Sequence, residues 1–265
     1  MRLASIASAS SGNCTYVGSM RTHVLVDTGC SKKRIDEGLE KLGLSLSDID
    51  AILVTHEHTD HIAGLHTILK KYDIPVYATG GTIAGIRMSD RKGDMRETSF
   101  NVIRADEELE IGDIRVDPFS IMHDALEPVG YRLSSSGKSV AVATDLGSFD
   151  DYTVKSLSGL NALLIEANHD IRMLQAGPYP YALKRRILAD TGHLSNEKSG
   201  ELLSRIMNNH MAGVILGHLS RENNLPELAR EAVKLEIDMG VCPYSGDDVK
   251  LTVAHRTELS EVIEV

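Results

Sequence analysis

Four potential metal ligands stand within six residues of this chain: His56, His58, Asp60 and His61. The apolar run 51–54 precedes them and is short enough to be one buried strand. Side chains alternate between the two sides of an extended segment, so His56 and His58 can reach one cation together. Asp60 and His61 follow where the chain turns toward a helix and can face a second cation. Imidazole and carboxylate donors without a thiolate suit Zn²⁺, Mn²⁺ or Fe, and they argue against a structural zinc finger.

Three further side chains with metal-binding groups stand at the ends of predicted strands. Asp145 follows the apolar segment 138–144, and a carboxylate in that position is rarely there for packing because burying it requires a partner. His123 and His218 also close predicted strands. A histidine at a strand end is by itself more often structural than a ligand, so these two need a further argument.

The order of these residues supplies that argument, because the chain resembles the metallo-β-lactamase fold hydrolases. Those proteins carry HxHxDH after a strand, followed by a distant His, an Asp and a final His. The resemblance spans nearly the whole chain. It implies an α/β (α+β) fold, an αβ/βα four-layer sandwich with two mixed sheets face to face, helices outside, and metals where strand ends converge.

The resemblance also implies a dinuclear metal site with Zn²⁺ or Mn²⁺, and with Fe left open. One ion would take His56, His58 and His123, the other Asp60, His61 and His218, with Asp145 as the bridge. Two such ions lower the pKa of a bridging water, so a metal-activated hydroxide attacks and no separate nucleophile is needed. Asp145 replaces a Cys that is frequent in true β-lactamases, which leans away from antibiotic hydrolysis.

Other polar residues are expected beside the metals. Asp27 ends a predicted buried strand and is expected to orient a metal-bound histidine or its loop, and Asp124 could orient His123. Ser195 or Asn196 can cap the following helix, whose first amides suit a phosphate. The candidates for substrate phosphate or for support of the ligands are Asn13, Asp27, Asp124, His169, Ser195 and Asn196, and the candidate catalytic residues are Asp60 and His193.

Three details resemble the bacterial YycJ (WalJ) branch of this family. They are Ser10-Ser-Gly-Asn-Cys14, Asn168-His-Asp170, and the pair Gly192-His-Leu-Ser-Asn196 and His218-Leu-Ser-Arg-Glu-Asn-Asn224. Members of this branch are regarded as 5′ to 3′ exonucleases on double-stranded DNA. The resemblance therefore implies a metal-dependent phosphodiester hydrolase acting on the 5′ end of duplex DNA. His169 and His193 would meet the terminal or scissile phosphate, and the basic residues 184–186 would follow the DNA backbone.

The length of 265 residues and the mass of 28.9 kDa fit one domain over residues 1–265. No window approaches eighteen consecutive apolar residues, so no membrane span is expected. The first ten residues contain too few consecutive apolar side chains for the core of a signal peptide. The three cysteines fit reduced thiols. These features favour a cytoplasmic protein.

The formal net charge is −10, from 28 Lys and Arg against 38 Asp and Glu. This balance counts against an extended nucleic-acid footprint, although two divalent ions would add about four positive charges where a phosphate binds. Three alternatives therefore stay open: a small-molecule (cyclic) phosphodiesterase, which the acidity favours modestly, a thioesterase, and a non-catalytic regulatory protein. The oligomeric state is left open.

The elements expected to position these residues alternate along the chain. Strands are predicted at 2–8, 14–18, 23–27, 51–54, 74–78, 101–104, 109–111, 114–121, 130–134, 138–144, 162–167, 214–218 and 249–254. Helices are predicted at 31–42, 61–72, 81–88, 151–158, 180–189, 196–208 and 226–238.

Overall fold

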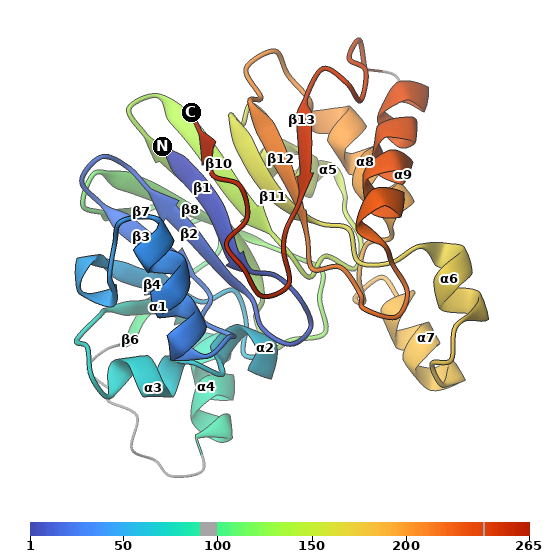
Figure 1. Cartoon of the computed structure of the whole chain (residues 1–265). Helices are drawn as coiled ribbons and strands as arrows, with labels where there is room; N and C mark the ends of the chain where they lie inside the picture. Colours follow the sequence, from blue (N-terminus) through green and yellow to red (C-terminus); the bar gives the residue numbers. More distant parts are fainter. Residues whose placement is uncertain (91–99, 241) are drawn as a thin grey trace.

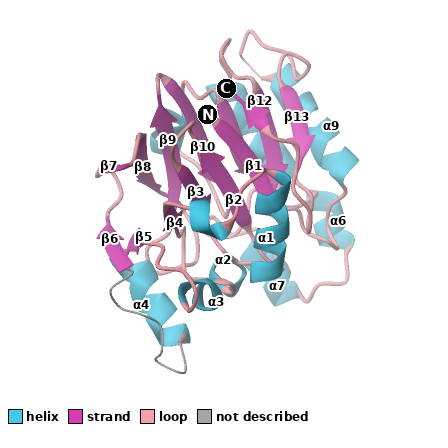
Figure 2. Cartoon of the chain, turned by 60° about the vertical axis from the view of Figure 1, so that its left-hand side comes forward, coloured by secondary structure: helices cyan, strands magenta, loops and turns pink. Residues whose placement is uncertain are grey.

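The computed structural model describes residues 1–90, 100–240 and 242–265. Two seven-stranded sheets lie face to face (Figures 1 and 2). The first has the order β14 (Ile263–Glu264), β1 (Arg2–Ala7), β2 (Cys14–Gly18), β3 (His23–Val26), β4 (Ala51–Leu53), β5 (Val76–Thr79) and β6 (Phe100–Ile103). The second has the order β13 (Lys250–Val253), β12 (Gly213–Gly217), β11 (Ala162–Glu166), β10 (Lys138–Ala143), β9 (Val129–Ser135), β8 (Ile114–Ser120) and β7 (Leu109–Ile111).

Helices cover the outer face of each sheet. Beside the first sheet lie α1 (Lys32–Lys41), α2 (Thr59–Ile62), α3 (Leu65–Leu69) and α4 (Gly80–Ser89), with a short 3₁₀ helix at Leu46–Asp48. Beside the second lie α5 (Asp151–Leu157), α8 (Asn196–Ile206) and α9 (Pro226–Met239). Helices α6 (Ile171–Ala176) and α7 (Tyr181–Ile187) project from the lower right of Figure 1. Within the described ranges, no helix has both the length and the apolar character to cross a membrane.

The strand sequences explain three separate apolar layers. Strands buried on both faces alternate between two cores, so Leu163 and Ile165 pack with the helices of the second sheet while Leu164 packs between the sheets. Leu25 and Val26 divide in the same way in the first sheet. Apolar layers therefore separate helix, sheet, sheet and helix, which confirms the predicted four-layer sandwich.

The prediction of one helix over residues 61–72 is wrong, because α2 and α3 are separate. The carbonyl of Asp60 would accept the amide of Gly64 in a continuous helix, but it accepts the amide of Asn13 at 2.8 Å instead. The Gly64 amide donates to Thr28 at 2.8 Å. Loops from two other strands thus interrupt the helix just after the HxHxDH motif. The sequence prediction also omitted α6 and β14.

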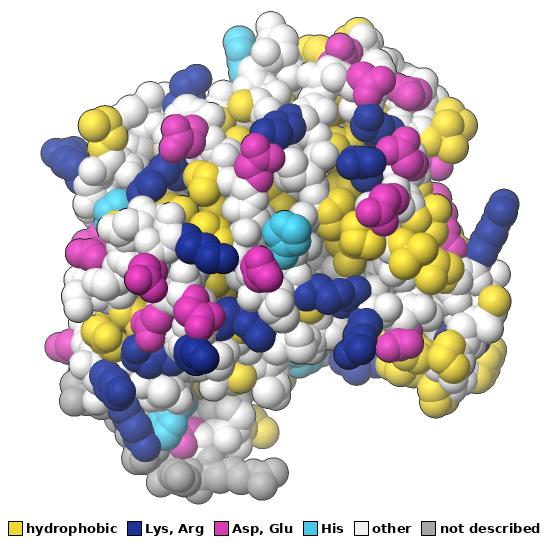
Figure 3. All heavy atoms as spheres, in the orientation of Figure 1, with side chains coloured by type: hydrophobic (Ala, Val, Ile, Leu, Met, Phe, Trp, Pro, Cys, Tyr) yellow, Lys and Arg dark blue, Asp and Glu magenta, His cyan; other side chains and the backbone are white. Residues whose placement is uncertain are grey.

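The direction of the strands brings their carboxyl ends to one edge of the sandwich. Strands β1, β3 and β4 run in one direction in the first sheet, as do β8, β10, β11 and β12 in the second. On the face shown in Figure 3, acidic and basic side chains are interspersed rather than gathered by sign. The predicted metal-binding histidines and aspartates instead lie together at the edge where the carboxyl ends of these strands meet.

Candidate metal centre

The predicted ligands converge at the carboxyl edge of both sheets. His56, His58, Asp60 and His61 follow β4, and the other three predicted ligands follow strands of the second sheet. The donor atoms group into His56, His58 and His123 on one side and Asp60, His61 and His218 on the other, with Asp145 against His56 and His61. Residues from several separate segments of the sequence thus lie in one cluster, close to the arrangement that the sequence predicts.

The first group consists of three imidazoles that point at one place. His58 Nδ1 lies 3.0 Å from His56 Nε2 and 3.2 Å from His123 Nε2. Nitrogen donors on a tetrahedral zinc ion, with bonds of about 2.0–2.1 Å, stand roughly 3.3 Å apart. The spacing of these nitrogens therefore fits a single divalent cation.

The second group combines two imidazoles with two carboxylates. Asp60 Oδ2 lies 3.5 Å from His218 Nε2 and 3.6 Å from His61 Nε2, and Asp145 Oδ2 lies 3.2 Å from His61 Nε2. Among the described residues, the buried atoms His218 Nε2 and Asp145 Oδ2 have no hydrogen-bond partner. Buried polar atoms are normally paired, so these two also fit coordination of a divalent cation.

Hydrogen bonds behind the cluster fix which ring nitrogen faces inward. The Nδ1 atoms of His61 and His218 lie 2.7 Å from carboxylate oxygens of Asp27 and Glu166 respectively. His123 Nδ1 lies 3.2 Å from the Gly192 carbonyl oxygen. A ring that donates through Nδ1 presents the lone pair of Nε2, so these contacts prepare the inward nitrogens for a metal.

Thr55 extends this support to His56. Its hydroxyl donates to Asp27 Oδ2 at 2.8 Å and can accept from His56 Nδ1 at 3.0 Å, while its amide donates to Asp27 Oδ1 at 2.8 Å. Asp27 therefore holds both the predicted ligand His61 and the loop at Thr55 by hydrogen bonds. Asp27, Asp145 and His218 have φ of 62°, 59° and 55°, a left-handed conformation that is costly and frequent at functional sites.

Glu166 is the main residue absent from the sequence-based site. It is fully buried at the end of β11, and its Oε1 lies 2.7 Å from His218 Nδ1 and 2.8 Å from His193 Nδ1. Its Oε2 accepts the amides of Leu146 and Leu194 at 3.0 and 3.2 Å. The signal was present, because Glu166 is a carboxylate at the end of an apolar strand, like Asp145.

The electrostatics of the cluster demand positive charge at its centre. Burial alone would lower the pKa of His61, but the Asp145 and Asp27 carboxylates outweigh it and raise that pKa well above its ordinary value. Burial would raise the pKa of Asp145, but His218 and His61 hold it well below its ordinary value. Burial lowers the pKa of His56, and His61 lowers it further. The buried carboxylates thus draw positive charge onto the neighbouring imidazoles, and a divalent cation would balance the same carboxylates.

Two of the predicted supporting residues take roles different from those expected. Asp124 accepts a 2.6 Å hydrogen bond from Arg186 Nε, and the Gly192 carbonyl, not Asp124, holds the outer nitrogen of His123. Ser195 caps α8, while the buried side chain of Asn196 exchanges hydrogen bonds of 3.0 and 2.8 Å with Asn224. The side chain of Asn196 is therefore engaged with Asn224.

The remaining predicted residues lie close to the cluster. Asn13 Nδ2 lies 3.1 Å from His61 Nε2 and 3.3 Å from Asp60 Oδ2. His193 lines the pocket over the cluster and is tilted against the rings of His123 and His218. His169 and Ser195 lie in a neighbouring recess that His193 also borders.

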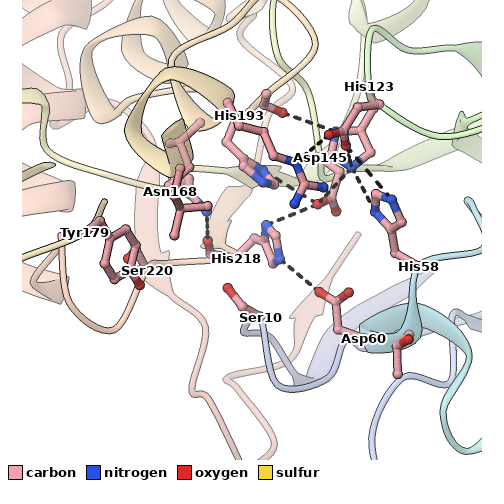
Figure 4. Close-up of a pocket in the computed structure, with 16 residues that line it drawn as sticks. Ser10, His58, Asp60, His123, Asp145, Asn168, Tyr179, His193, His218 and Ser220 are labelled. Carbon is pink, nitrogen blue, oxygen red and sulfur yellow. Dashed lines mark hydrogen bonds and ion pairs between the residues drawn. The ribbon is translucent and has the colours of Figure 1, made fainter. Parts of the chain in front are cut away.

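An open pocket of about 410 Å³ leads to the cluster (Figure 4). His58, Asp60, His123, Asp145 and His218 form its floor. Its wall on one side comes from the segment around α7, through Tyr179, Leu183, Arg186 and Ile187. A substrate in this pocket would therefore lie beside α7.

Comparison with known proteins is consistent with this geometry. The model of the Beta-lactamase superfamily domain matches residues 22–218. Exodeoxyribonuclease WalJ of Streptococcus pneumoniae is 38% identical over 239 residues, which cover 89% of each protein, and Exodeoxyribonuclease YycJ of Bacillus anthracis is 38% identical over 228 residues, 86% of each.

Solved structures show the same fold at lower sequence similarity. The crystal structure of Zn²⁺-bound PqqB from Methylobacterium extorquens superimposes with a TM-score of 0.73 over the full length of both chains at 20% identity. YhfI from Bacillus subtilis, a metallo-β-lactamase fold protein, gives a TM-score of 0.69 over 98% of each chain at 16% identity. The chain therefore belongs to the metallo-β-lactamase superfamily and, within it, to the family of the WalJ and YycJ proteins.

Proposed function

We propose that this protein is a metal-dependent exodeoxyribonuclease that removes nucleotides from the 5′ end of duplex DNA, using two divalent ions, Zn²⁺ or Mn²⁺. The histidine and aspartate cluster supports a hydrolytic metal site, and the relatives named exodeoxyribonuclease match most of the chain. The observation that carries the choice of DNA is the charge of the segment beside the pocket.

That segment, residues 171–189, is defined here as the basic arm. It contains Arg172, Lys184, Arg185 and Arg186 and no acidic residue, although the chain as a whole has a net charge of −10. It forms α6 and α7, which project from the body of the molecule (Figure 1), and residues of α7 line the pocket. Tyr181 is 76% exposed, and the Arg185 guanidinium lies 6.0 Å from the centre of its ring. A local basic surface with an exposed aromatic ring fits a nucleic-acid backbone better than a small acidic ester.

When bound, two divalent ions supply an activated water and neutralise charge on the scissile phosphate. Seven side chains would hold these ions: Asp60, Asp145, His56, His58, His61, His123 and His218. The hydrogen bonds behind the histidines fix the orientation of their rings. Arg186 lines the pocket while paired with Asp124, so it is placed to exchange that carboxylate for a phosphate oxygen. The chain thus positions a phosphodiester over the cluster.

His193 is the residue best placed to supply a proton. Glu166 holds its Nδ1 at 2.8 Å, which leaves Nε2 as the atom that can pass a proton to the leaving oxygen. Burial would lower the pKa of His193, but the Glu166 carboxylate outweighs it and raises the pKa. A raised pKa favours the protonated ring that a general acid requires.

The test is hydrolysis of a duplex with a 5′-phosphate and separate labels on each strand end, by protein loaded with Mn²⁺ or Zn²⁺. We expect stepwise release of nucleotides from the 5′ end. Bis(p-nitrophenyl) phosphate and a small cyclic phosphodiester are run in parallel. Hydrolysis of these small esters without any release from DNA would reject the exonuclease in favour of a small-molecule phosphodiesterase.

A further inference from the structure

Two buried thiols lie behind the loops that hold the predicted metal ligands. Cys14 begins β2 and Cys30 precedes α1, and both are free cysteines in the apolar layer between the first sheet and its helices. The Gly29 amide donates to the Asn13 carbonyl at 2.7 Å, so the residues just before the two cysteines are joined directly. A Cβ atom on Gly12 would stand 2.9 Å from Cys30 Cα and Cβ, so the two segments pack without space between them.

The two side chains also contact each other, and their chemical states differ. Burial raises the pKa of Cys14, and a hydrogen bond from its thiol to the Cys30 sulfur raises it further. The same hydrogen bond lowers the pKa of Cys30 against the opposing effect of burial, and Arg34 also lowers it. Cys30 lies at the start of the ten-residue helix α1, and a helix N-terminus stabilises a thiolate. Cys30 is therefore the thiol that ionises more easily, while Cys14 keeps its proton.

The surroundings make Cys30 the first of the two to meet a small reagent. Its relative exposure is 2%, against 0% for Cys14, and the next residue, Ser31, is exposed. A molecule close to water in size reaches Cys30 through a local opening at the start of α1. The third cysteine, Cys242, packs against the helices of the second sheet and belongs to a different apolar layer. Cys14 and Cys30 are therefore the pair that can be joined within one chain.

A peroxide joins such a pair in two balanced steps. The Cys30 thiolate attacks one oxygen of hydrogen peroxide, the O–O bond breaks, and the hydroxide that leaves takes up a proton to become water. The Cys14 thiol then attacks the sulfur of the Cys30 sulfenic acid, the S–O bond breaks, and a second water leaves with the Cys14 proton. Each sulfur loses one electron and the peroxide gains two.

The loops that carry the two cysteines also hold the HxHxDH segment. The Asn13 amide donates to the Asp60 carbonyl and the Thr28 amide to the His61 carbonyl, both at 2.8 Å. The side chain of Asn13 adds a contact of 3.1 Å between its Nδ2 and His61 Nε2. A movement of either loop therefore reaches the ligands Asp60 and His61.

We propose that Cys14 and Cys30 form a redox site, at which hydrogen peroxide produces a disulfide that weakens metal binding by Asp60 and His61. The bond brings the two sulfurs to about 2.0 Å, closer than two thiols in hydrogen-bond contact, so it pulls the two loops toward each other. Reduction by a thiol restores both free cysteines and the original positions of the ligands. This inference rests on the metal centre of the proposed function, but not on the substrate that the protein hydrolyses.

The experiment treats the metal-depleted, reduced protein with hydrogen peroxide, removes the excess with catalase and then measures two properties. Peptide mapping by mass spectrometry without reduction identifies the linkage, and competition with a chromogenic chelator measures the affinity for Zn²⁺. The samples are the wild type, Cys14→Ala, Cys30→Ala and the matched control Cys242→Ala. Before treatment all four should bind Zn²⁺ equally, because the thiols are not ligands of the metal centre.

After treatment, the wild type and Cys242→Ala should contain the Cys14–Cys30 disulfide. Their affinity for Zn²⁺ should fall about tenfold or more, as a loss of support for metal ligands implies, and dithiothreitol should restore it. Cys14→Ala should stop at the Cys30 sulfenic acid, which dimedone labels, and Cys30→Ala should keep its affinity.

The linkage and the affinity can each overturn the proposal. Absence of the disulfide in the treated wild type, or a disulfide that leaves the affinity for Zn²⁺ unchanged, would overturn it. An equal loss of affinity in treated Cys30→Ala and wild type would place the oxidation elsewhere and overturn it as well. A fall in affinity with the expected linkage supports the inference even if the protein hydrolyses no DNA. The wild-type measurements decide the proposal if thermal denaturation shows that an alanine variant does not fold.

Discussion

At the scale of single residues, the metal centre depends as much on the outer contacts of the histidines as on the histidines themselves. Asp27, Glu166, Thr55 and the Gly192 carbonyl each engage an Nδ1 atom and direct Nε2 inward. Glu166 has two such contacts, because its buried carboxylate accepts hydrogen bonds from both His193 and His218. Its charge and its position are both needed.

Glu166→Gln tests this role. The amide keeps the size of the side chain, but it is neutral, and its NH₂ group would replace either the oxygen that faces both imidazoles or the oxygen that accepts the two backbone amides. Loss of a group that supports metal ligands typically costs about 10–100-fold in metal affinity or activity. We expect a loss of this size in metal affinity, measured by competition with a chromogenic chelator, and in DNA hydrolysis. Unchanged metal affinity and activity would show that the histidines do not need this support.

The residue types explain which parts of the site could be predicted from the sequence. The HxHxDH motif can be recognised because four potential ligands lie within six residues, and Asp145 because it is a carboxylate at the end of an apolar strand. Glu166 met the same rule but was not recognised. Thr55 and the Gly192 carbonyl could not be found, because a hydroxyl or a backbone oxygen acquires this role only through tertiary contacts.

At the scale of elements, the basic arm is the part of the fold that would distinguish DNA from a small ester. Its charges are local: Arg172 and Arg185 are exposed on α6 and α7, outside the pocket lining. Electrostatic binding to DNA releases counterions, so each phosphate that the protein neutralises adds to the dependence of affinity on salt. The arm therefore predicts a specific salt effect.

The double variant Arg172→Ala, Arg185→Ala should bind duplex DNA more weakly and with less sensitivity to salt. The slope of log K against log salt should fall by about 0.9 for each DNA phosphate that the variant no longer neutralises. Fluorescence anisotropy with a labelled duplex at several salt concentrations measures this slope. The matched control is Lys33→Ala, an exposed basic residue on α1. An equal slope in the double variant and the wild type would exclude the arm from the DNA interface.

The elements were predicted well where apolar patterns are long, and less well near the site. The predicted helix 61–72 divides into α2 and α3 because Asn13 and Thr28 compete for its backbone hydrogen bonds. Such competition comes from loops distant in sequence, which no local pattern records. The short elements α6 and β14 were missed because they carry too few residues for a clear periodicity.

At the scale of the whole molecule, one polar junction ties the two sheets at the end opposite the metal centre. Asp113 lies between β7 and β8 and accepts hydrogen bonds from Ser19 and Thr22, in the turn between β2 and β3, at 2.6 and 2.7 Å. Ser135 of β9 donates to its other oxygen at 3.3 Å. The hydroxyl donors lower the pKa of Asp113 to about 2, from an ordinary value of 3.8.

This shift predicts how acid affects stability. A carboxyl whose pKa is lower in the folded state stabilises the protein above its unfolded pKa, and this contribution is lost as the pH falls through the folded pKa. The stabilisation by Asp113 should therefore be full above about pH 4 and lost toward pH 2. Urea denaturation of the wild type and Asp113→Asn should differ in midpoint at pH 6 and converge as the pH approaches 2. A difference that does not depend on pH would contradict the account.

Metal removal should destabilise the whole fold, since the cluster joins both sheets. A ligand that binds only the folded state at 100 times its Kd adds about 2.7 kcal/mol to the free energy of unfolding. In a chain of this size that corresponds to a rise in Tm of several degrees. Differential scanning calorimetry with Mn²⁺, Zn²⁺ or EDTA measures the shift. Identical Tm values under all three conditions would argue against metal binding.

The four-layer sandwich and the superfamily follow from the sequence because ligand order and strand patterns are both properties of the chain in one dimension. One domain over residues 1–265, the number of metal ions and the strand polarity of cleavage stay predictions. The number of ions and the polarity of cleavage depend on metal binding and on the position of the substrate, which the spacing of residues along the chain does not determine.

The most direct measurement of the central claim is a metal titration during DNA hydrolysis. Metal-depleted protein is titrated with Mn²⁺ or Zn²⁺ while nucleotide release from a 5′-phosphorylated duplex is recorded, for the wild type and for Asp145→Asn. The account predicts no release without metal, saturation near two ions per chain, and at least a roughly hundredfold lower rate in the variant because the bridging carboxylate is absent. Full activity in the metal-free protein, or in Asp145→Asn, would contradict it.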